Sequence, residues 1–153
     1  MIRHIILLIG IALPGTIKIT AQQAPVNQRI KAERVAFYND KLELTAKEAE
    51  KFWPVYNDYT NRQEKLNMER RMLLRYIDSN SDNMSEEEIE ESLRKYIENQ
   101  NASHALFIEY NKKFLEILPV EKVIRLYIVE NQFKQYLLRK IGDARMERAG
   151  GRR

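Results

Sequence analysis

The longest apolar repeat in the chain lies between Leu44 and Arg75 and has the spacing of a helix. Apolar side chains recur there every three or four residues, at Ala49, Phe52, Trp53, Tyr56, Tyr59, Leu66 and Leu73. This recurrence places them on one face of a helix with 3.6 residues per turn. Thr45 and Glu48 form the pattern of a capping box, which marks a helix start. We therefore predict that this is the longest helix, bent at Pro54, where one backbone hydrogen bond is lost.

Three further helices are predicted around this one. The first covers residues 29–42, and a second capping box, Ser85 with Glu88, starts a third helix that ends at Leu118-Pro119. The apolar stripe of the third helix is formed by Ile89, Leu93, Tyr96, Ile97, Phe107, Tyr110, Phe114 and Ile117. Residues 120–141 form the fourth helix, with Gly142 as its stop. The turn-forming segment 78–83 is short, so the second and third helices should pair antiparallel in an all-α fold.

Composition agrees with a single helical domain. The chain has 153 residues, with five Gly and four Pro, and between residues 27 and 140 it has no Gly and only Pro54 and Pro119. Hairpin turns normally need glycine, so strands are not expected. The 26 basic and 22 acidic residues are interspersed. The net charge of +4 therefore does not predict a nucleic-acid partner.

The first 21 residues have the layout of a secretory signal peptide. A basic start at Arg3 is followed by an apolar run over residues 5–13 and by an expected cleavage site near Ala21. The run is shorter than the roughly 20 apolar residues of a membrane span. We expect a periplasmic protein without a stable span, with residues 22–28 as a flexible lead-in, 29–141 as the helical domain and 142–153 as a basic flexible tail. The alternative is an uncleaved interfacial or weak membrane anchor.

The residues that most enzymes and metal sites use are scarce. Cysteine is absent, as are a glycine-rich phosphate loop, a nucleophile elbow and a zinc-protease motif, and His104 is the one histidine beyond the signal segment. We predict a non-enzyme with no cofactor and no metal. The alternative is a soft-metal site formed by Met68, Met72, Met84 and His104.

Aromatic and aliphatic residues are abundant on the two central helices. The most prominent are Phe52, Trp53, Tyr56, Phe107 and Phe114. A small helical domain has difficulty covering all of them, and surplus apolar surface usually binds a partner. The alternative is that all of them are buried within one chain.

Three motifs carry a family resemblance. Leu44-Thr45-x-x-Glu48 is followed by Phe52-Trp53-Pro54-x-Tyr56, and Leu118-Pro119-x-x-Lys122 lies between the third and fourth helices. This arrangement resembles the LTxxQ-motif (Spy/CpxP-like) family of small periplasmic proteins, and most closely small exported proteins described as sensors of extracytoplasmic-function sigma factors. The chain departs from the family pattern at Glu48 and Lys122, which replace Gln, and at Pro119, which replaces Thr.

The resemblance implies long bent helical hairpins that pair into a cradle-like dimer. The concave face of such a dimer holds unfolded or sensor-domain polypeptide. We accordingly predict a non-enzymatic, periplasmic polypeptide-binding homodimer with a chaperone-like or envelope-stress-sensing role. Its client contacts are predicted at Phe52, Trp53, Tyr56, Phe107 and Phe114. One alternative is a dedicated regulator that docks an anti-sigma factor or a sensor kinase, and another is a metal sensor.

Overall fold

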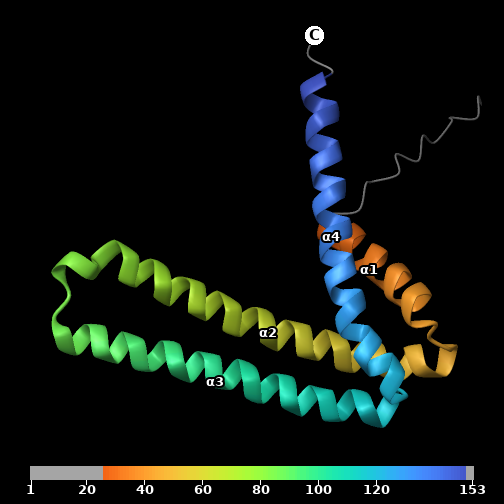
Figure 1. Ribbon diagram of the computed structural model, residues 1–153, viewed down its shortest axis with the longest axis horizontal. Coiled ribbons are helices and arrows are strands. Elements are labelled where there is room, and N and C mark those ends of the chain that lie inside the picture. Colours follow the sequence, from red (N-terminus) through yellow and green to blue (C-terminus); the bar gives the residue numbers. More distant parts are fainter. Residues whose placement is uncertain (1–25, 151–153) are drawn as a thin grey trace, which may run out of the picture.

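The predicted all-α fold with four helices is confirmed in a computed structural model (Figure 1). The structure describes residues 26–150, with side chains for 28–146. The elements are α1 (Val26–Leu42), α2 (Ala46–Asn80), the short 3-10 turn η1 (Ser81–Asn83), α3 (Glu86–Ile117) and α4 (Val120–Gly150). The predicted signal peptide, most of the lead-in and residues 151–153 lie outside the described residues.

Helices α2 and α3 form a long antiparallel hairpin, as the short turn predicted (Figure 1). Both predicted capping boxes are present. The Thr45 amide donates to the Glu48 carboxylate at 2.8 Å, and the Glu48 amide donates to the Thr45 hydroxyl at 3.2 Å. Ser85 and Glu88 repeat the same two bonds at the start of α3. Each box satisfies amide groups that a helix start otherwise leaves unpaired.

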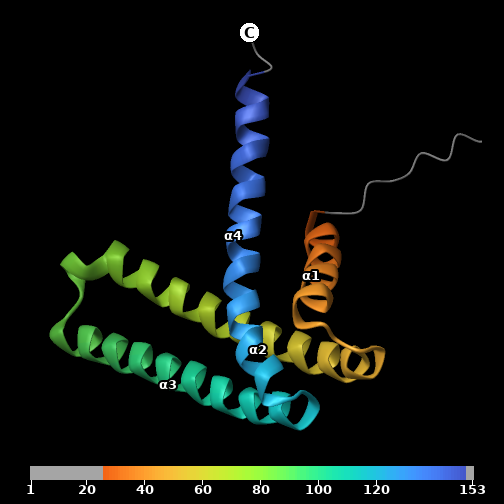
Figure 2. The same cartoon turned by 45° about the vertical axis from the view of Figure 1, so that its right-hand side comes forward.

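Helix α4 leaves the hairpin steeply and runs antiparallel beside α1 (Figures 1 and 2). The change of direction occurs at Leu118-Pro119. Leu118 is extended, with φ −120° and ψ 149°, because a residue before proline avoids the helical conformation. The Pro119 carbonyl then accepts the first backbone bonds of α4, from Lys122 and Val123. Proline therefore sets where α3 ends and α4 begins.

The core lies at one end of the hairpin, where all four helices meet. Its buried members are Tyr38, Leu42, Phe52, Tyr56, Leu106, Tyr110, Phe114, Leu118, Val123, Leu126, Val129 and Phe133. Between residues 57 and 105, the only buried residue is Ser92. The far half of the hairpin is therefore a two-helix arm that α1 and α4 do not cover (Figure 2).

Some predicted boundaries were wrong. Helix α1 begins at Val26 instead of residue 29, and α2 reaches Asn80, inside the predicted turn. Gly142 does not stop α4, which continues to Gly150, so the predicted flexible tail does not begin at residue 142. One glycine costs a helix only about 1 kcal/mol relative to alanine, and good helix formers surround this one. Helix α2 runs through Pro54, as predicted, and the side chain of Pro54 is exposed.

None of the described helices combines the length and the apolar character needed to cross a lipid bilayer.

Candidate functional site

The two motif segments meet in space, although 74 residues separate their charged members. The Lys122 ammonium lies 2.9 Å from the Glu48 carboxylate, and both side chains are about four-fifths covered. The hydrogen bond from Lys122 is the main cause that lowers the pKa of Glu48, and the capping bond from Thr45 acts in the same direction. The departures from the family pattern at these two positions therefore form a matched ion pair.

Lys122 makes a second contact in the same place. Its ammonium donates to the backbone carbonyl of Glu43 at 2.7 Å. Glu43 has a positive φ of 51°, a conformation that non-glycine residues adopt only at a cost. Lys122 thus joins the start of α4 to the left-handed turn between α1 and α2. This cluster, Glu43, Thr45, Glu48 and Lys122, is called the motif clasp below.

Three of the predicted client-binding residues are not available to a client in this structure. Phe52, Tyr56 and Phe114 are 0%, 3% and 1% exposed, and their rings pack against one another in the core, with centroids 5.2–6.4 Å apart. Their placement on the client-binding surface was therefore wrong. They lie on the seam where α2 and α3 face each other, and burying aromatic rings there contributes the most stability.

The other two predicted residues lie nearer the surface. Trp53 is half-buried, and its indole N–H donates to the Asn39 side chain of α1 at 3.0 Å, so it joins α1 to α2. Phe107 is 38% exposed. Its ring lies 5.4 Å from that of Tyr127 on α4, where α3 and α4 diverge. Only Phe107 therefore presents much apolar area to a partner.

A line of exposed apolar side chains runs along α3, separate from the core seam. Its members are Ile89, Leu93, Ile97, Phe107, Ile108 and Leu115, all between 38% and 57% exposed. They recur at helical spacing on one flank of α3, and the polar residues Gln100 and His104 lie on the same line. This set is called the α3 stripe. The sequence pattern had merged it with the buried residues Tyr110 and Phe114.

The opposite flank of α3 carries charged residues that pair with one another. Arg94 contacts Glu98 at 2.6 Å and Glu91 at 2.5 Å, and Lys113 contacts Glu109 at 2.6 Å. Because these charges are satisfied along the helix itself, that flank needs no partner. The unpartnered surface of α3 is therefore the stripe.

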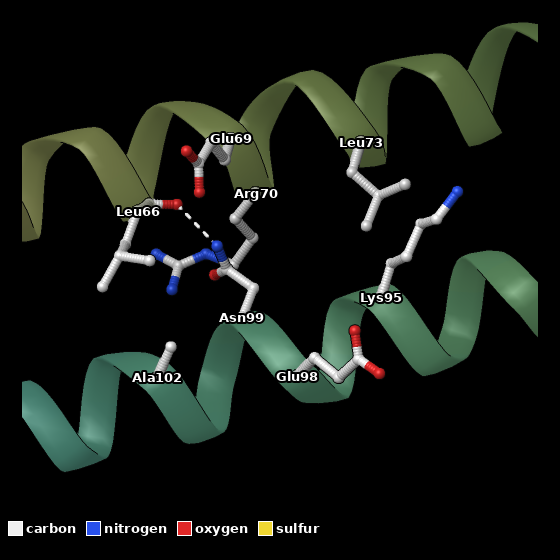
Figure 3. Close-up of a pocket in the computed structure, with 8 residues that line it drawn as sticks. All are labelled: Leu66, Glu69, Arg70, Leu73, Lys95, Glu98, Asn99 and Ala102. Atoms are coloured by element: carbon white, nitrogen blue, oxygen red, sulfur yellow. Dashed lines mark hydrogen bonds between the residues drawn. The ribbon is translucent and has the colours of Figure 1, made fainter.

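A shallow hollow of about 400 Å³ lies between α2 and α3 in the two-helix arm (Figure 3). It is lined by Leu66, Glu69, Arg70 and Leu73 of α2 and by Lys95, Glu98, Asn99 and Ala102 of α3. The Asn99 amide donates to the Leu66 carbonyl across it at 3.0 Å. Its two acidic and two basic side chains balance, so the hollow favours neither an anion nor a cation.

No group of three or more His, Cys, Asp or Glu side chains that could hold a metal occurs among the described residues. His104 is exposed on the α3 stripe, away from Met84 in the turn.

No family model, curated protein or solved structure matches the chain. The LTxxQ-motif resemblance therefore depends on the three sequence motifs alone and stays a prediction. The predicted periplasmic location, which is based on the signal-peptide layout of the first 21 residues, also stays a prediction.

Proposed function

We propose that this protein is a non-enzymatic polypeptide-binding protein of the periplasm, and that the α3 stripe is its binding surface. The observation that carries the proposal is the exposure of the stripe. Six large apolar side chains lie exposed along one flank of α3. Ile89, Leu93 and Ile97 lie on the two-helix arm, and Phe107, Ile108 and Leu115 lie at the core end of the hairpin. Contiguous exposed apolar area of this kind usually marks an interaction site.

The chemistry of the stripe fits an extended or unfolded polypeptide. From Leu93 to Leu115 the line holds aliphatic and aromatic side chains with a few neutral polar ones, and acidic residues occur beside it only at its start, at Glu86 and Glu90. Such a surface can accept different apolar segments without a fixed geometry. Binding of this kind uses neither a cofactor nor a nucleotide. Binding of this kind would serve either a chaperone-like role or the sensing of unfolded envelope proteins.

A binding measurement with matched variants tests this proposal. The mature protein should bind reduced, carboxymethylated α-lactalbumin, which is permanently unfolded, in a fluorescence anisotropy titration. Leu93 and Ile97 are 57% and 49% exposed, so a client can still cover about half of each side chain. At roughly 1.5–3 kcal/mol for complete burial, the double variant Leu93→Glu/Ile97→Glu should lose about 1.5–3 kcal/mol, or at least tenfold in affinity.

The matched control is Leu138→Glu, which places the same charge at a 69% exposed position of α4, outside the stripe. It should bind as the wild type does. Absence of binding by the wild-type protein at several-fold molar excess, or equal binding by the double variant, would contradict the proposal.

A second candidate partner for the stripe is another copy of this chain. The apolar positions of the stripe are arranged almost symmetrically about Ala102. Ile89 and Leu115 lie equally far from Ala102 in the sequence, and so do Ile97 and Phe107. Two antiparallel copies of α3 could therefore match apolar positions across a twofold axis. This arrangement would agree with the homodimer that the family resemblance implies.

Light scattering after size exclusion separates the two partners. A wild-type dimer that becomes a monomer in Leu93→Glu/Ile97→Glu would assign the stripe to the homodimer. A wild-type mass that the variant does not change would leave the stripe to a client. A pull-down that yields one stoichiometric partner, in place of many, would favour a dedicated regulator of an anti-sigma factor or sensor kinase.

A further inference from the structure

Three helices meet at a hydrogen-bonded carboxyl group near the centre of the core. The Tyr56 hydroxyl of α2 donates to the Glu130 carboxyl of α4 at 3.1 Å. The hydroxyls of Tyr56 and Tyr38, which lies on α1, are 2.9 Å apart. Since Tyr56 uses its proton toward Glu130, Tyr38 donates to Tyr56. This chain, Tyr38, Tyr56 and Glu130, is called the tyrosine–carboxyl joint.

Glu130 lacks the partner that a covered carboxylate usually has. It is half-buried, and among the described residues it forms no ion pair. Lys134 of α4 and Arg34 of α1 are the cations whose charges act on it, but neither forms an ion pair with it. The Arg34 guanidinium lies over the Phe133 ring at 5.7 Å, and its Nε atom is buried without a hydrogen-bond partner. A carboxyl group in such a place costs free energy when it is ionised and is better accommodated when it is protonated and neutral.

The groups that face Glu130 come from three helices. Tyr56 of α2 contacts Glu130 directly, and the charge of Glu130 acts on or is acted on by Arg34 and Tyr38 of α1, Tyr59 of α2, and Tyr127 and Lys134 of α4. Helix α3 reaches the joint through the uncharged ring of Phe114, which packs against Tyr56. Burial is the main cause that raises the pKa of Glu130. The hydrogen bond from Tyr56 and the charges of Lys134 and Arg34 oppose it.

We propose that the tyrosine–carboxyl joint is a proton-controlled connection that holds the α1–α4 pair on the α2–α3 hairpin. With Glu130 protonated, the hydroxyls of Tyr38 and Tyr56 and the carbonyl oxygen of the Glu130 carboxyl form one neutral hydrogen-bonded chain across the helices. Ionisation leaves an unpaired charge between them and favours separation of α1 and α4 from the hairpin. Separation would uncover the buried Tyr56, which contacts Tyr38 of α1 and Glu130 of α4. This inference does not depend on the proposed function, because it concerns opening of the protein alone.

The direction of the pH effect follows from the raised pKa. The folded protein retains the proton of Glu130 more strongly than the unfolded chain does. The contribution of Glu130 is therefore complete below the unfolded-state pKa of about 4.3 and is lost as the pH rises through the higher folded value. Glu33, Glu48 and Asp58 have lowered pKa values, so their contributions are already complete above about pH 5. A series from pH 5 to pH 9 thus isolates Glu130 from these three groups.

The protein contains a reporter at the joint. Trp53 is the only tryptophan in the chain. It is bonded to Asn39 of α1, and its ring lies 6.0 Å from that of Tyr38. Its fluorescence therefore follows separation of α1 from α2, and urea titrations with this signal give a midpoint at each pH.

The test compares the wild type with Glu130→Gln, Tyr56→Phe and the control Glu116→Gln, which removes an exposed carboxyl of α3 outside the joint. Between pH 5 and pH 9, the opening constant of the wild type should rise relative to that of Glu130→Gln. Glu116→Gln should follow the wild type. In Tyr56→Phe, Glu130 loses the hydroxyl that stabilises its charged form, so the pH step should move to higher pH.

Hydrogen exchange at each pH locates the opening. Amides of α1 and of the adjoining part of α4 should exchange faster in the wild type than in Glu130→Gln at pH 9, while those of the arm, residues 63–103, should not differ. An equal pH dependence in wild type and Glu130→Gln would overturn the proposal, as would a Tyr56→Phe step at lower pH. If Glu130→Gln does not fold, the direction of the Tyr56→Phe shift decides alone.

Discussion

The motif clasp makes a specific prediction about the substitution Lys122→Met. The change keeps most of the aliphatic length of the side chain and removes its ammonium group. The ammonium bonds the Glu48 carboxylate at 2.9 Å and the Glu43 carbonyl at 2.7 Å. Removing it therefore leaves a carboxylate and a backbone carbonyl without this partner.

The magnitude follows from how covered these groups are. Hydrogen bonds to charged groups contribute about 1.5–3 kcal/mol, whereas exposed ion pairs contribute about 0–1 kcal/mol. The side chains of Lys122 and Glu48 are 22% and 18% exposed, which lies between the two cases. Because Lys122 makes two such contacts, each contributing about 0.75–1.5 kcal/mol, we expect a loss of about 1.5–3 kcal/mol in the free energy of unfolding. At about 4 °C per kcal/mol, the melting temperature should fall by about 6–12 °C.

Urea unfolding at pH 6.5, followed by circular dichroism, measures this loss. A double-mutant cycle with Glu48→Gln separates the ion pair from the other contacts of Lys122, and the coupling should be about 1 kcal/mol. Lys112→Met, at an exposed lysine of α3, is the control and should change stability by less than about 0.5 kcal/mol.

The pH dependence gives an independent check. Because Lys122 lowers the pKa of Glu48, the contribution of the pair is complete above the unfolded-state pKa of about 4.3 and is lost as the pH falls through the lower folded value. The difference between wild type and Lys122→Met should therefore shrink between pH 6 and pH 3. A difference that stays constant over this range, or a coupling near zero, would refute the reasoning.

Three further substitutions test the fold. Gly142→Ala should raise the free energy of unfolding by about 0.5–1 kcal/mol, because an added Cβ meets nothing within 4 Å and the helix continues on both sides; a loss of stability would show that α4 does not continue there. Ser85→Ala should lower it by about 1 kcal/mol through loss of the cap of α3, and an unchanged urea midpoint would count against that cap. Phe114→Ala should lower it by about 3–5 kcal/mol, and a loss below 1 kcal/mol would mean that this ring is not in the core.

The local features of the chain could be predicted because they depend on neighbouring residues. The number of helices, the two capping boxes, the break at Leu118-Pro119 and the antiparallel hairpin follow from apolar periodicity and from the chemistry of helix ends. Gly142 was misjudged because a single weak helix former is overridden by good ones on both sides.

The tertiary structure alone decided which apolar residues are buried. Tyr110 and Phe114 belong to a line on α3 that meets α2, while Leu93 and Ile97 belong to a neighbouring line that stays exposed. Steps of three and four residues connect both lines, so periodicity cannot separate them. Their separation depends on which face of α3 packs against α2, where Tyr110 meets Tyr59 and Phe114 meets Phe52.

The contacts of the clasp and the joint were likewise decided in three dimensions. Glu48 and Lys122 are 74 residues apart, as are Tyr56 and Glu130. In the sequence, each appears as an ordinary charged or aromatic residue of its own helix. The sequence determined the helices of this protein because helix formation is local, and packing determined its surfaces because burial depends on distant parts of the chain.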